Sequence, residues 1–268
     1  MRIGETVLEM HFHSALMKLI EEKLGLGPKA SFNFYKYSPQ LEKFIGFDQA
    51  YVMSQLSDKV LFSKLKTAAL TSDYKMGPKF VGLFLQFKVV HELKKKSKTM
   101  PPSIKSAPCY RVSLYTSRTA TNVQSQHELL YQLSKNTPGA FVYYACPMIF
   151  DKVKLYAPPN MADLRLAKVD SCPGPYTDND KHYIFYATPN AAPIWKSDPV
   201  IGEAVGPEDM ATSIANYFRE TSAVQSLENL RAILSAINVS SILAQEAPES
   251  TRNLVLEAFT ILAINEKR

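Results

Sequence analysis

Cysteine is scarce in this chain, and its three cysteines lie far apart. Cys109, Cys146 and Cys172 form no CxxC pair, and an odd number of thiols cannot close a complete disulfide framework. We therefore expect neither a disulfide scaffold nor a zinc knuckle, and we interpret the thiols as buried or incidental.

Long hydrophobic runs are also missing. No uninterrupted apolar stretch approaches the roughly 20 residues that a membrane span needs. Charged residues and histidines from Glu5 to Lys18 interrupt the N-terminal region, which argues against a signal peptide. We therefore expect a cytoplasmic protein without a membrane partner. The GxxxxGK[ST], GxGxxG and GxSxG motifs are absent as well, so any ATP-driven step would belong to a partner.

The composition is that of a globular protein with a basic balance. The 268 residues are 46% hydrophobic and 21% charged, and the formal net charge is +6. Lysine and arginine neutralise phosphates, so this balance is compatible with a polyanionic partner. The densest basic run is Lys94-Lys95-Lys96-Ser97-Lys98. It is either a solvated loop or a phosphate contact, and the sequence leaves both open.

The first 150 residues alternate between helical and extended patterns. Apolar residues recur with a helical period near the N-terminus and stop at Gly25, whereas the stretch after Lys79 is nearly continuously apolar, as in a central strand. The alternation predicts a mixed sheet flanked by helices. In chain order we expect a helix over 5–23, strands over 31–37, 46–53 and 80–90, an additional strand over 110–115, a helix over 124–133 and a strand over 140–145, with a lysine-rich insertion over about 55–78.

The second half of the chain changes character twice. Residues 151–199 are rich in Pro, Asn and Asp and predict a loop-heavy elaboration with one strand over 182–186. Three further segments, 209–219, 226–237 and 249–264, are apolar at helical spacing. We therefore predict a core over 1–200 and a helical C-terminal appendage over 201–268.

Two polar side chains on adjacent predicted strands suggest chemistry. Asp48 lies on the second strand, and Lys88 lies at the end of the apolar third strand, where an ammonium would incur a desolvation cost without a polar surrounding. Hydrolysis of a phosphodiester requires a divalent cation with oxygen ligands and a positive group near the attacking water or the phosphate. A carboxylate and a lysine that meet in one cleft would meet that requirement.

These residues resemble the PD-(D/E)xK nuclease superfamily, which includes many restriction enzymes. The matching positions are Glu9 on the first helix, Gly46-Phe47-Asp48 on a strand, and Leu85-Gln86-Phe87-Lys88 at the end of a later strand. The order helix, three strands, helix, strand is also similar, and the resemblance covers about residues 5–146. It implies an α/β fold of the restriction-endonuclease-like type, a mixed sheet flanked by helices. Gln86 departs from the usual Glu or Asp, as in Mrr-like branches.

The resemblance also implies roles for these residues. Asp48, the Gln86 side-chain oxygen, the Phe87 backbone carbonyl and Glu9 would hold Mg²⁺ or Mn²⁺, and Lys88 would position the attacking water or stabilise charge on the phosphate. The substrate would be DNA, with RNA left open. The protein would be an endonuclease of a restriction or anti-phage system, acting as a homodimer or with a sensor or ATPase subunit.

Several alternatives stay open on the sequence alone. Lys88 could snorkel at a strand end while Asp48 caps a turn, or Gln86 could mark a nucleic-acid-binding or scaffolding subunit that has lost catalysis. Glu5 and His13 share a helix face with Glu9 and are expected at the surface. Gln124 and Gln126 open a helix near the cleft or in solvent. If the nuclease hypothesis holds, the site residues converge around a spot open to solvent.

Overall fold

The computed structural model describes most, but not all, of the chain. It covers residues 3–25, 32–36, 49–53, 79–116, 124–178, 180–196, 199–222, 224–226, 228–229, 232–233, 236 and 261–264, with the backbone alone for 32–36, 49–53, 79–80 and 261–264. Asp48, the insertion predicted over 55–78 and most of the helix predicted over 249–264 lie outside the described residues.

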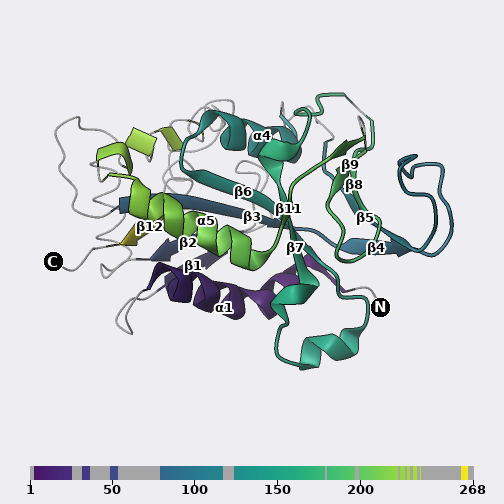
Figure 1. The fold of residues 1–268 in the computed structure, drawn as a ribbon, viewed down its shortest axis with the longest axis horizontal. Helices are drawn as coiled ribbons and strands as arrows, with labels where there is room; N and C mark the ends of the chain where they lie inside the picture. The colour runs from purple at the N-terminus through teal and green to yellow at the C-terminus, as the bar shows by residue number, and fades with distance from the viewer. Residues whose placement is uncertain are drawn as a thin grey trace, which may run out of the picture.

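The fold is mixed α/β and contains two sheets (Figure 1). The larger sheet has seven strands. In spatial order they are β1 (Phe32–Lys36), β2 (Gln49–Met53), β12 (Ile261–Ile264), β3 (Lys79–Phe87), β6 (Ala140–Pro147), β7 (Leu164–Lys168) and β11 (Ala204–Val205).

Parallel and antiparallel pairings are combined in this sheet. The strands β1, β2 and β3 form antiparallel pairs, and β3 then runs parallel to β6, with Gln86 opposite Tyr144. The strand β2 meets β3 directly only through Gln49 and Ala50, and β12 lies between the two strands farther along. The expectation of a mixed sheet is therefore confirmed.

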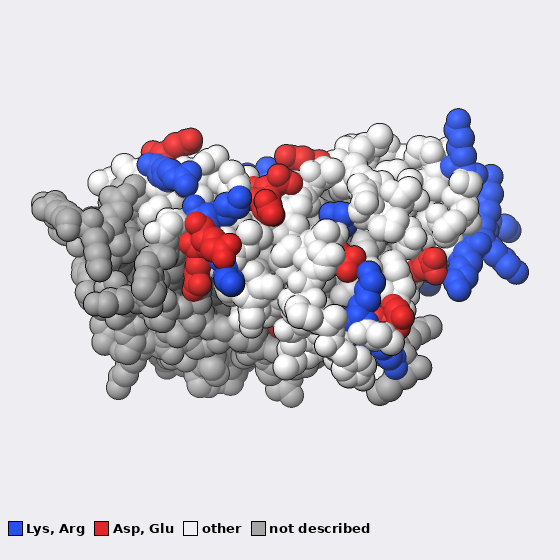
Figure 2. All heavy atoms as spheres, turned by 60° about the horizontal axis from the view of Figure 1, so that its bottom comes forward, with Lys and Arg blue, Asp and Glu red and all other residues white. Residues whose placement is uncertain are grey.

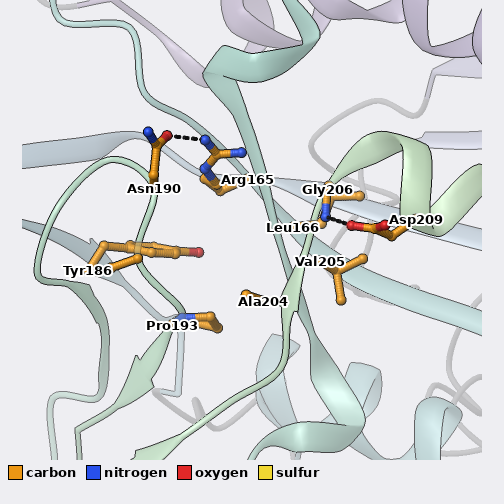
Figure 3. A pocket seen from close by; sticks show the side chains of 10 residues that line it. Arg165, Leu166, Tyr186, Asn190, Pro193, Ala204, Val205, Gly206 and Asp209 are labelled. Atoms are coloured by element: carbon orange, nitrogen blue, oxygen red, sulfur yellow. Dashed lines mark hydrogen bonds between the residues drawn. The ribbon is translucent and has the colours of Figure 1, made fainter.

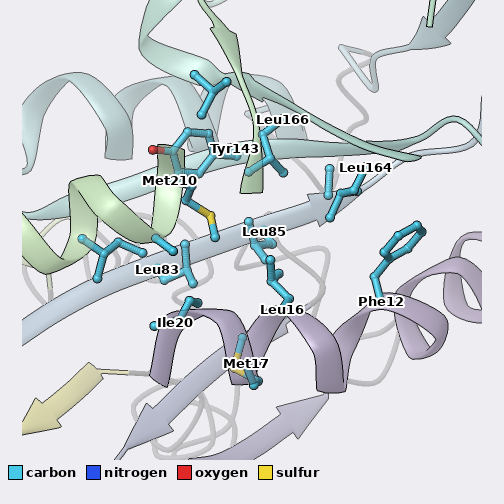
Figure 4. Close-up of a cluster of buried hydrophobic side chains, with 14 of the residues drawn as sticks. Phe12, Leu16, Met17, Ile20, Leu83, Leu85, Tyr143, Leu164, Leu166 and Met210 are labelled. Carbon is cyan, nitrogen blue, oxygen red and sulfur yellow. The ribbon is translucent and has the colours of Figure 1, made fainter. Parts of the chain in front are cut away.

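Helices cover both faces of the seven-stranded sheet. The helices α1 (Glu5–Leu24) and α5 (Pro207–Glu220) pack against each other and share one hydrophobic cluster with alternate residues of β3, among them Leu83 and Leu85 (Figure 4). The helix α4 (Gln126–Asn136) packs against β6 from the other face, through residues that include His127. Both faces of β3 are thus covered, as its nearly continuous apolar sequence predicts.

The end of α1 confirms a stop that the sequence predicts. Gly25 adopts φ 67°, a left-handed conformation that costs glycine little, and its N–H donates to the carbonyls of Glu21 and Glu22. The helix begins at Glu5 and ends at Leu24, close to the predicted 5–23.

The second sheet was not predicted. Its five strands lie in the order β10 (Val200–Ile201), β9 (Ile194–Trp195), β8 (Tyr183–Tyr186), β5 (Cys109–Ser113) and β4 (Val90–Leu93). The predicted strand over 80–90 is therefore two strands in different sheets, because the chain leaves β3 after Phe87 and enters β4 at Val90.

Two further assignments are corrected by the structure. The segment over 151–199 contains β7 and β9 in addition to the one strand predicted there, since Leu164 to Lys168 extends the larger sheet and Ile194 pairs with Phe185 of β8. Residues 261–264 form strand β12, where helical spacing predicts a helix, because the segment pairs with β3. The helix α5 shares its core with the sheet, while the domain boundary near residue 200 stays a prediction.

Among the helices that the structure describes, none combines the length and the apolarity needed to cross a membrane.

Candidate active site

The candidate site forms where β3 ends, on the face that α4 covers. Alternation along β3 turns Leu85 and Phe87 toward α1 and α5, so Gln86 faces the opposite side. The backbone N–H of Lys88 still donates to the Ala145 carbonyl of β6, at 2.9 Å. This bond holds the residue after β3 beside its parallel neighbour, with its side chain directed to α4.

Three side chains form a hydrogen-bonded chain between β3 and α4. The Lys88 amine donates to Gln126 Oε1 at 2.9 Å, and Gln126 Nε2 donates to Gln86 Oε1 at 2.8 Å. Gln86 Nε2 in turn lies 3.3 Å from the carbonyl oxygen of its neighbour Phe87. We call Gln86, Lys88 and Gln126 the amide–lysine cluster.

The direction of these bonds follows from the chemistry of the lysine. A protonated lysine only donates, so Gln126 must present its oxygen to Lys88 and its nitrogen to Gln86. Gln86 must then accept with its oxygen, which turns its own nitrogen toward the Phe87 carbonyl. One charged group therefore fixes the orientation of both amides.

Two members of the cluster are closed to solvent, and Gln126 is half-buried. Gln86 and Lys88 are each 1% exposed. The Tyr115 ring covers the lysine, with its centroid 4.1 Å from the Lys88 amine, in a cation–π contact, while Tyr115 itself is 57% exposed. Hydrogen bonds link Gln86 to the Phe87 carbonyl and, through Gln126, to Lys88, but the convergence expected of these groups with Asp48 stays a prediction, and Gln86 and Lys88 lack the expected opening to solvent.

The acidic residues of α1 lie on the other face of the sheet. Glu9 is 2% exposed and lies on the helix that covers the opposite face of the sheet from Gln86 and Lys88. Glu5 and His13, both expected at the surface, are half-buried. Burial raises the pKa of the Cys146 thiol to about 12; Lys88 opposes that shift and Glu5 adds to it, so both charged residues lie near this β6 thiol. Asp48 lies outside the described residues, although its neighbour Gln49 faces Leu85, the neighbour of Gln86.

Gln126 is a site residue whose place the sequence left open. It lies in the first turn of α4, and two neighbours fix that turn. Ser125 caps the helix by accepting a hydrogen bond from the Glu128 N–H, and the His127 N–H donates to the Tyr115 carbonyl at 3.2 Å. Tyr115, which the sequence places at a strand end without a role, is thereby held beside Gln126.

His127 anchors the same turn to β6. Its Nε2 lies 3.1 Å from the Gly174 carbonyl, which can only accept, so Nε2 carries the proton and Nδ1 accepts from the Tyr144 hydroxyl at 2.9 Å. Burial lowers the pKa of His127 to about 4. The ring is therefore a neutral structural link and a poor candidate for a general base.

The three thiols are also structural. Cys109, Cys146 and Cys172 are free and buried, as the sequence predicts. Burial raises the pKa of each, to about 12 for Cys146 and about 11 for Cys172. A thiol with such a pKa is protonated at neutral pH and is a weak nucleophile.

A cavity of about 210 Å³ lies elsewhere, between β7, β8 and the start of α5 (Figure 3). Its charged groups serve the local structure: Arg165 donates to the Pro189 carbonyl and to Asn190, and Asp209 accepts from the Gly206 N–H at 2.9 Å. None of the amide–lysine cluster lines it. We therefore place the candidate chemistry at Lys88 and not in this cavity.

A divalent cation requires oxygen donors, and Gln86 of the cluster and residues outside it are of a suitable type. Gln86, the Phe87 carbonyl and Glu9 are of the type that Mg²⁺ prefers. In the present arrangement, however, the Gln86 nitrogen and not its oxygen lies beside the Phe87 carbonyl. The Gln86 oxygen and the Phe87 carbonyl fit a cation once the Gln86 amide turns over, whereas Glu9 lies on the helix that covers the other face of the sheet. Within the described part of the chain, no three His, Cys, Asp or Glu side chains gather into a metal-binding group.

No protein-family model, curated protein or solved structure matches this chain.

Proposed function

We propose that this protein is a metal-dependent nuclease of the restriction-endonuclease-like fold that hydrolyses phosphodiester bonds in DNA. The observation that carries the proposal is the buried Lys88 at the end of β3, hydrogen-bonded to Gln126 and, through it, to Gln86. Lys88 and Gln86 are both buried at the end of an otherwise apolar strand, which is costly and favours a functional reason for them.

The arrangement of the strands supports the same proposal. The helix α1 is followed by three antiparallel strands, and α4 then leads into β6, which runs parallel to β3. This is the order that the resemblance implies. It brings the ends of β3 and β6 together with the start of β2, and Gln49, which follows Asp48 in the sequence, faces Leu85.

In the proposed reaction, a water attacks phosphorus and the bond to the leaving sugar oxygen breaks. Lys88 holds a positive charge at the end of β3, where it orients the water or stabilises charge on the phosphate oxygens. Gln126 fixes the position of that amine. Asp48, Glu9, the Gln86 oxygen and the Phe87 carbonyl would hold Mg²⁺ or Mn²⁺, which supplies Lewis-acid stabilisation and lowers the pKa of a bound water.

The hydrogen bonds of the cluster must rearrange before a cation or a phosphate can bind there. The donors and acceptors of the two amides define how they rearrange. Turning the Gln86 amide brings its oxygen to the Phe87 carbonyl and its nitrogen to Gln126. Gln126 must then turn as well, so that its oxygen accepts from Gln86. Its nitrogen then faces the Lys88 amine, and two donors cannot hydrogen-bond to each other. The lysine is thereby released from Gln126 and becomes available to a phosphate. Cation binding and lysine release are thus expected to be coupled.

The test uses the full chain with plasmid DNA in Mg²⁺, in Mn²⁺ and in EDTA. We expect cleavage that EDTA abolishes and that is lost in Asp48→Ala and in Lys88→Met, a substitution that keeps the volume of the buried side chain. Lys18→Met on the surface of α1 is the matched control and should cleave like the wild type. Thermal unfolding shows which variants are folded. Cleavage that survives in folded forms of both site variants would overturn the assignment.

A second candidate is a nucleic-acid-binding subunit that has lost catalysis. One observation favours it. Position 86 carries an amide and not a carboxylate, and the oxygen of that amide accepts a hydrogen bond from Gln126. Salt-sensitive DNA binding without cleavage in either metal would support this second function.

A further inference from the structure

The hairpin formed by β4 and β5 carries most of the net charge of the chain. Between residues 90 and 113 it has five lysines and Arg111 against the single carboxylate of Glu92, a net +5 of the total +6. Figure 2 shows these cations gathered at one end of the molecule, the end to which β4 and β5 project in Figure 1. The remainder of the chain is nearly neutral.

The lysines of this hairpin are exposed and almost unpaired. Lys94 lies 4.0 Å from Glu92, in an ion pair at the surface that contributes little. Lys95, Lys96, Lys98 and Lys105 are exposed and form no ion pair within the described part of the chain. Four ammonium groups on one loop repel one another, so the loop is most stable when an anion lies nearby.

The loop is nevertheless held in one conformation by its own small core. Met100 and Ile104 are buried with Cys109, Phe185 and Ile194. The Ser97 N–H donates to the Met100 sulfur at 3.2 Å, and the Met100 N–H donates back to the Ser97 carbonyl at 3.1 Å. A solvated charge run needs no such core. The bonds present the lysines on a fixed support.

Arg111 strengthens the support from β5. Its Nη1 donates to the Thr99 hydroxyl at 3.4 Å, and its guanidinium lies 4.8 Å from the centroid of the Tyr183 ring. Thr99 is bonded in turn to Ser97 through their hydroxyl groups, at 3.0 Å. The segment between Lys96 and Met100 is thus fixed from two sides.

The hairpin is tied directly to the candidate active site. The strand β4 begins two residues after Lys88, and Val90 pairs with Val112 while Leu93 pairs with Cys109. An extended chain advances about 3.4 Å per residue, so Lys95 lies at most roughly 24 Å from Lys88. B-form DNA rises about 3.4 Å per base pair along its axis. This reach corresponds to about six or seven base pairs.

We propose that Lys95, Lys96 and Lys98 form a platform that binds the phosphate backbone of duplex DNA, with Lys95 at most about seven base pairs from the phosphate at Lys88. The proposal rests on the proposed nuclease function for the position of the scissile phosphate. The platform contacts phosphates only, so it sets the orientation of the duplex and the strength of binding without reading its sequence.

The experiment measures DNA binding in a Lys88→Met background, so that cleavage does not interfere. The triple variant Lys95→Gln/Lys96→Gln/Lys98→Gln is compared with Lys18→Gln/Lys23→Gln/Lys135→Gln, which removes the same charge from the distant ends of α1 and α4. Each phosphate contact contributes about 0.9 to the slope of log K against log salt. We expect the platform variant to lower the slope by about 2–3 and the control to leave it unchanged.

The length of the duplex provides a second measurement. The Lys88→Met protein should bind a 16-base-pair duplex at least tenfold more tightly than a 6-base-pair duplex. The platform variant should lose most of this gain in affinity. An unchanged slope and an unchanged gain in the platform variant would overturn the platform. Equal binding of a double-stranded RNA of the same length would overturn the assignment to DNA.

Failure of the platform and failure of the nuclease function are separable. If the wild type cleaves plasmid DNA and the platform variant shows the control's salt slope, the platform is wrong and the nuclease stands. If the wild type never cleaves but the salt slope of the platform variant is lower by about 2–3, the platform stands and the catalytic proposal is wrong.

Discussion

The amine of Lys88 and the side-chain oxygen of Gln126 are 2.9 Å apart, although 38 residues separate them in the sequence. The bond joins the end of a central strand to the first turn of the helix on one face of the sheet. Because Gln126 also donates to Gln86, a change at any of the three residues affects the orientation of the other two. Two predictions test this arrangement.

Gln86→Glu is expected to strengthen cation binding. The carboxylate keeps the bond that Gln126 donates but loses the N–H that lies beside the Phe87 carbonyl, so two oxygens face each other there. Without metal the variant should melt at a lower temperature than the wild type. Added Mg²⁺ or Mn²⁺ should raise its melting temperature more, since each tenfold gain in affinity contributes about 1.4 kcal/mol. Gln132→Glu, on the exposed part of α4, should respond to metal like the wild type. An identical metal response in Gln86→Glu would show that this position is not a ligand.

Gln126→Leu is expected to destabilise the fold. It removes an acceptor from a buried ammonium and a donor from Gln86, and each lost bond in a buried site costs about 1–3 kcal/mol. Urea unfolding should therefore show a loss of about 2–4 kcal/mol. Gln132→Leu on the same helix is the control and should lose far less. A Gln126→Leu protein as stable as this control would contradict the hydrogen-bonded chain.

The free energy of unfolding is expected to decrease as the pH falls, because His127 binds a proton more readily in the unfolded chain than in the folded protein. Its folded pKa of about 4 lies below the ordinary 6.5, so the unfolded chain binds more protons between these values. The contribution is complete above pH 6.5 and is lost as the pH falls toward 4. Its size is about 3 kcal/mol. The titratable groups that contact the ring are Tyr144, Cys172 and Tyr176, and the charge of nearby His182 lowers the pKa further.

The measurement for this prediction is urea unfolding at pH 7 and at pH 4.5. Carboxylates also titrate in this range, so the informative quantity is the difference between the wild type and His127→Gln. The variant should be less stable at pH 7 and should lose less of its stability on acidification. Equal losses in the two proteins would show that His127 is not protonated on unfolding.

Gly139→Ala is expected to destabilise the turn before β6. Gly139 has φ 78°, and a Cβ there would meet the Tyr217 hydroxyl and lie 2.9 Å from its ring carbon Cζ. Tyr217 cannot move away easily, because it lies on α5 and its hydroxyl is bonded to Asn229. Strain and overpacking together should cost about 2–4 kcal/mol. Gly174→Ala, where a Cβ meets nothing within 4 Å, is the control for thermal unfolding.

The end of α1 and much of the larger sheet can be predicted from sequence because their signals are local. The stop at Gly25 and the apolar run of β3 each depend on neighbouring residues, and both are confirmed. The second sheet could not be predicted in this way. Lys88 and Val89 separate β3 from β4 within what is one nearly continuous apolar run in the sequence, and only the tertiary pairing of Val90 with Val112 shows that β4 belongs to another sheet.

The candidate site follows the same division. The pattern Gln86-Phe87-Lys88 at the end of an apolar run identifies two members of the cluster from sequence. Gln126 carries no local signal, because a glutamine in the first turn of a helix is equally common in solvent. Its role depends on the packing of α4 against β6, which His127 and Tyr144 establish. The closure of the cluster by Tyr115 depends in the same way on contacts distant in sequence.

The place of β12 in the sheet has a consequence for how the chain folds. Gly82 pairs with Ile261, so a central strand acquires one of its partners from a segment near the far end of the sequence. Contacts between residues so far apart slow folding, since a long loop must close before they form. On the ribosome, β2 and β3 can meet at Gln49 and Leu85 long before β12 is synthesised. The sheet that supports Lys88 would therefore be completed late, only after the segment that forms β12 has been synthesised.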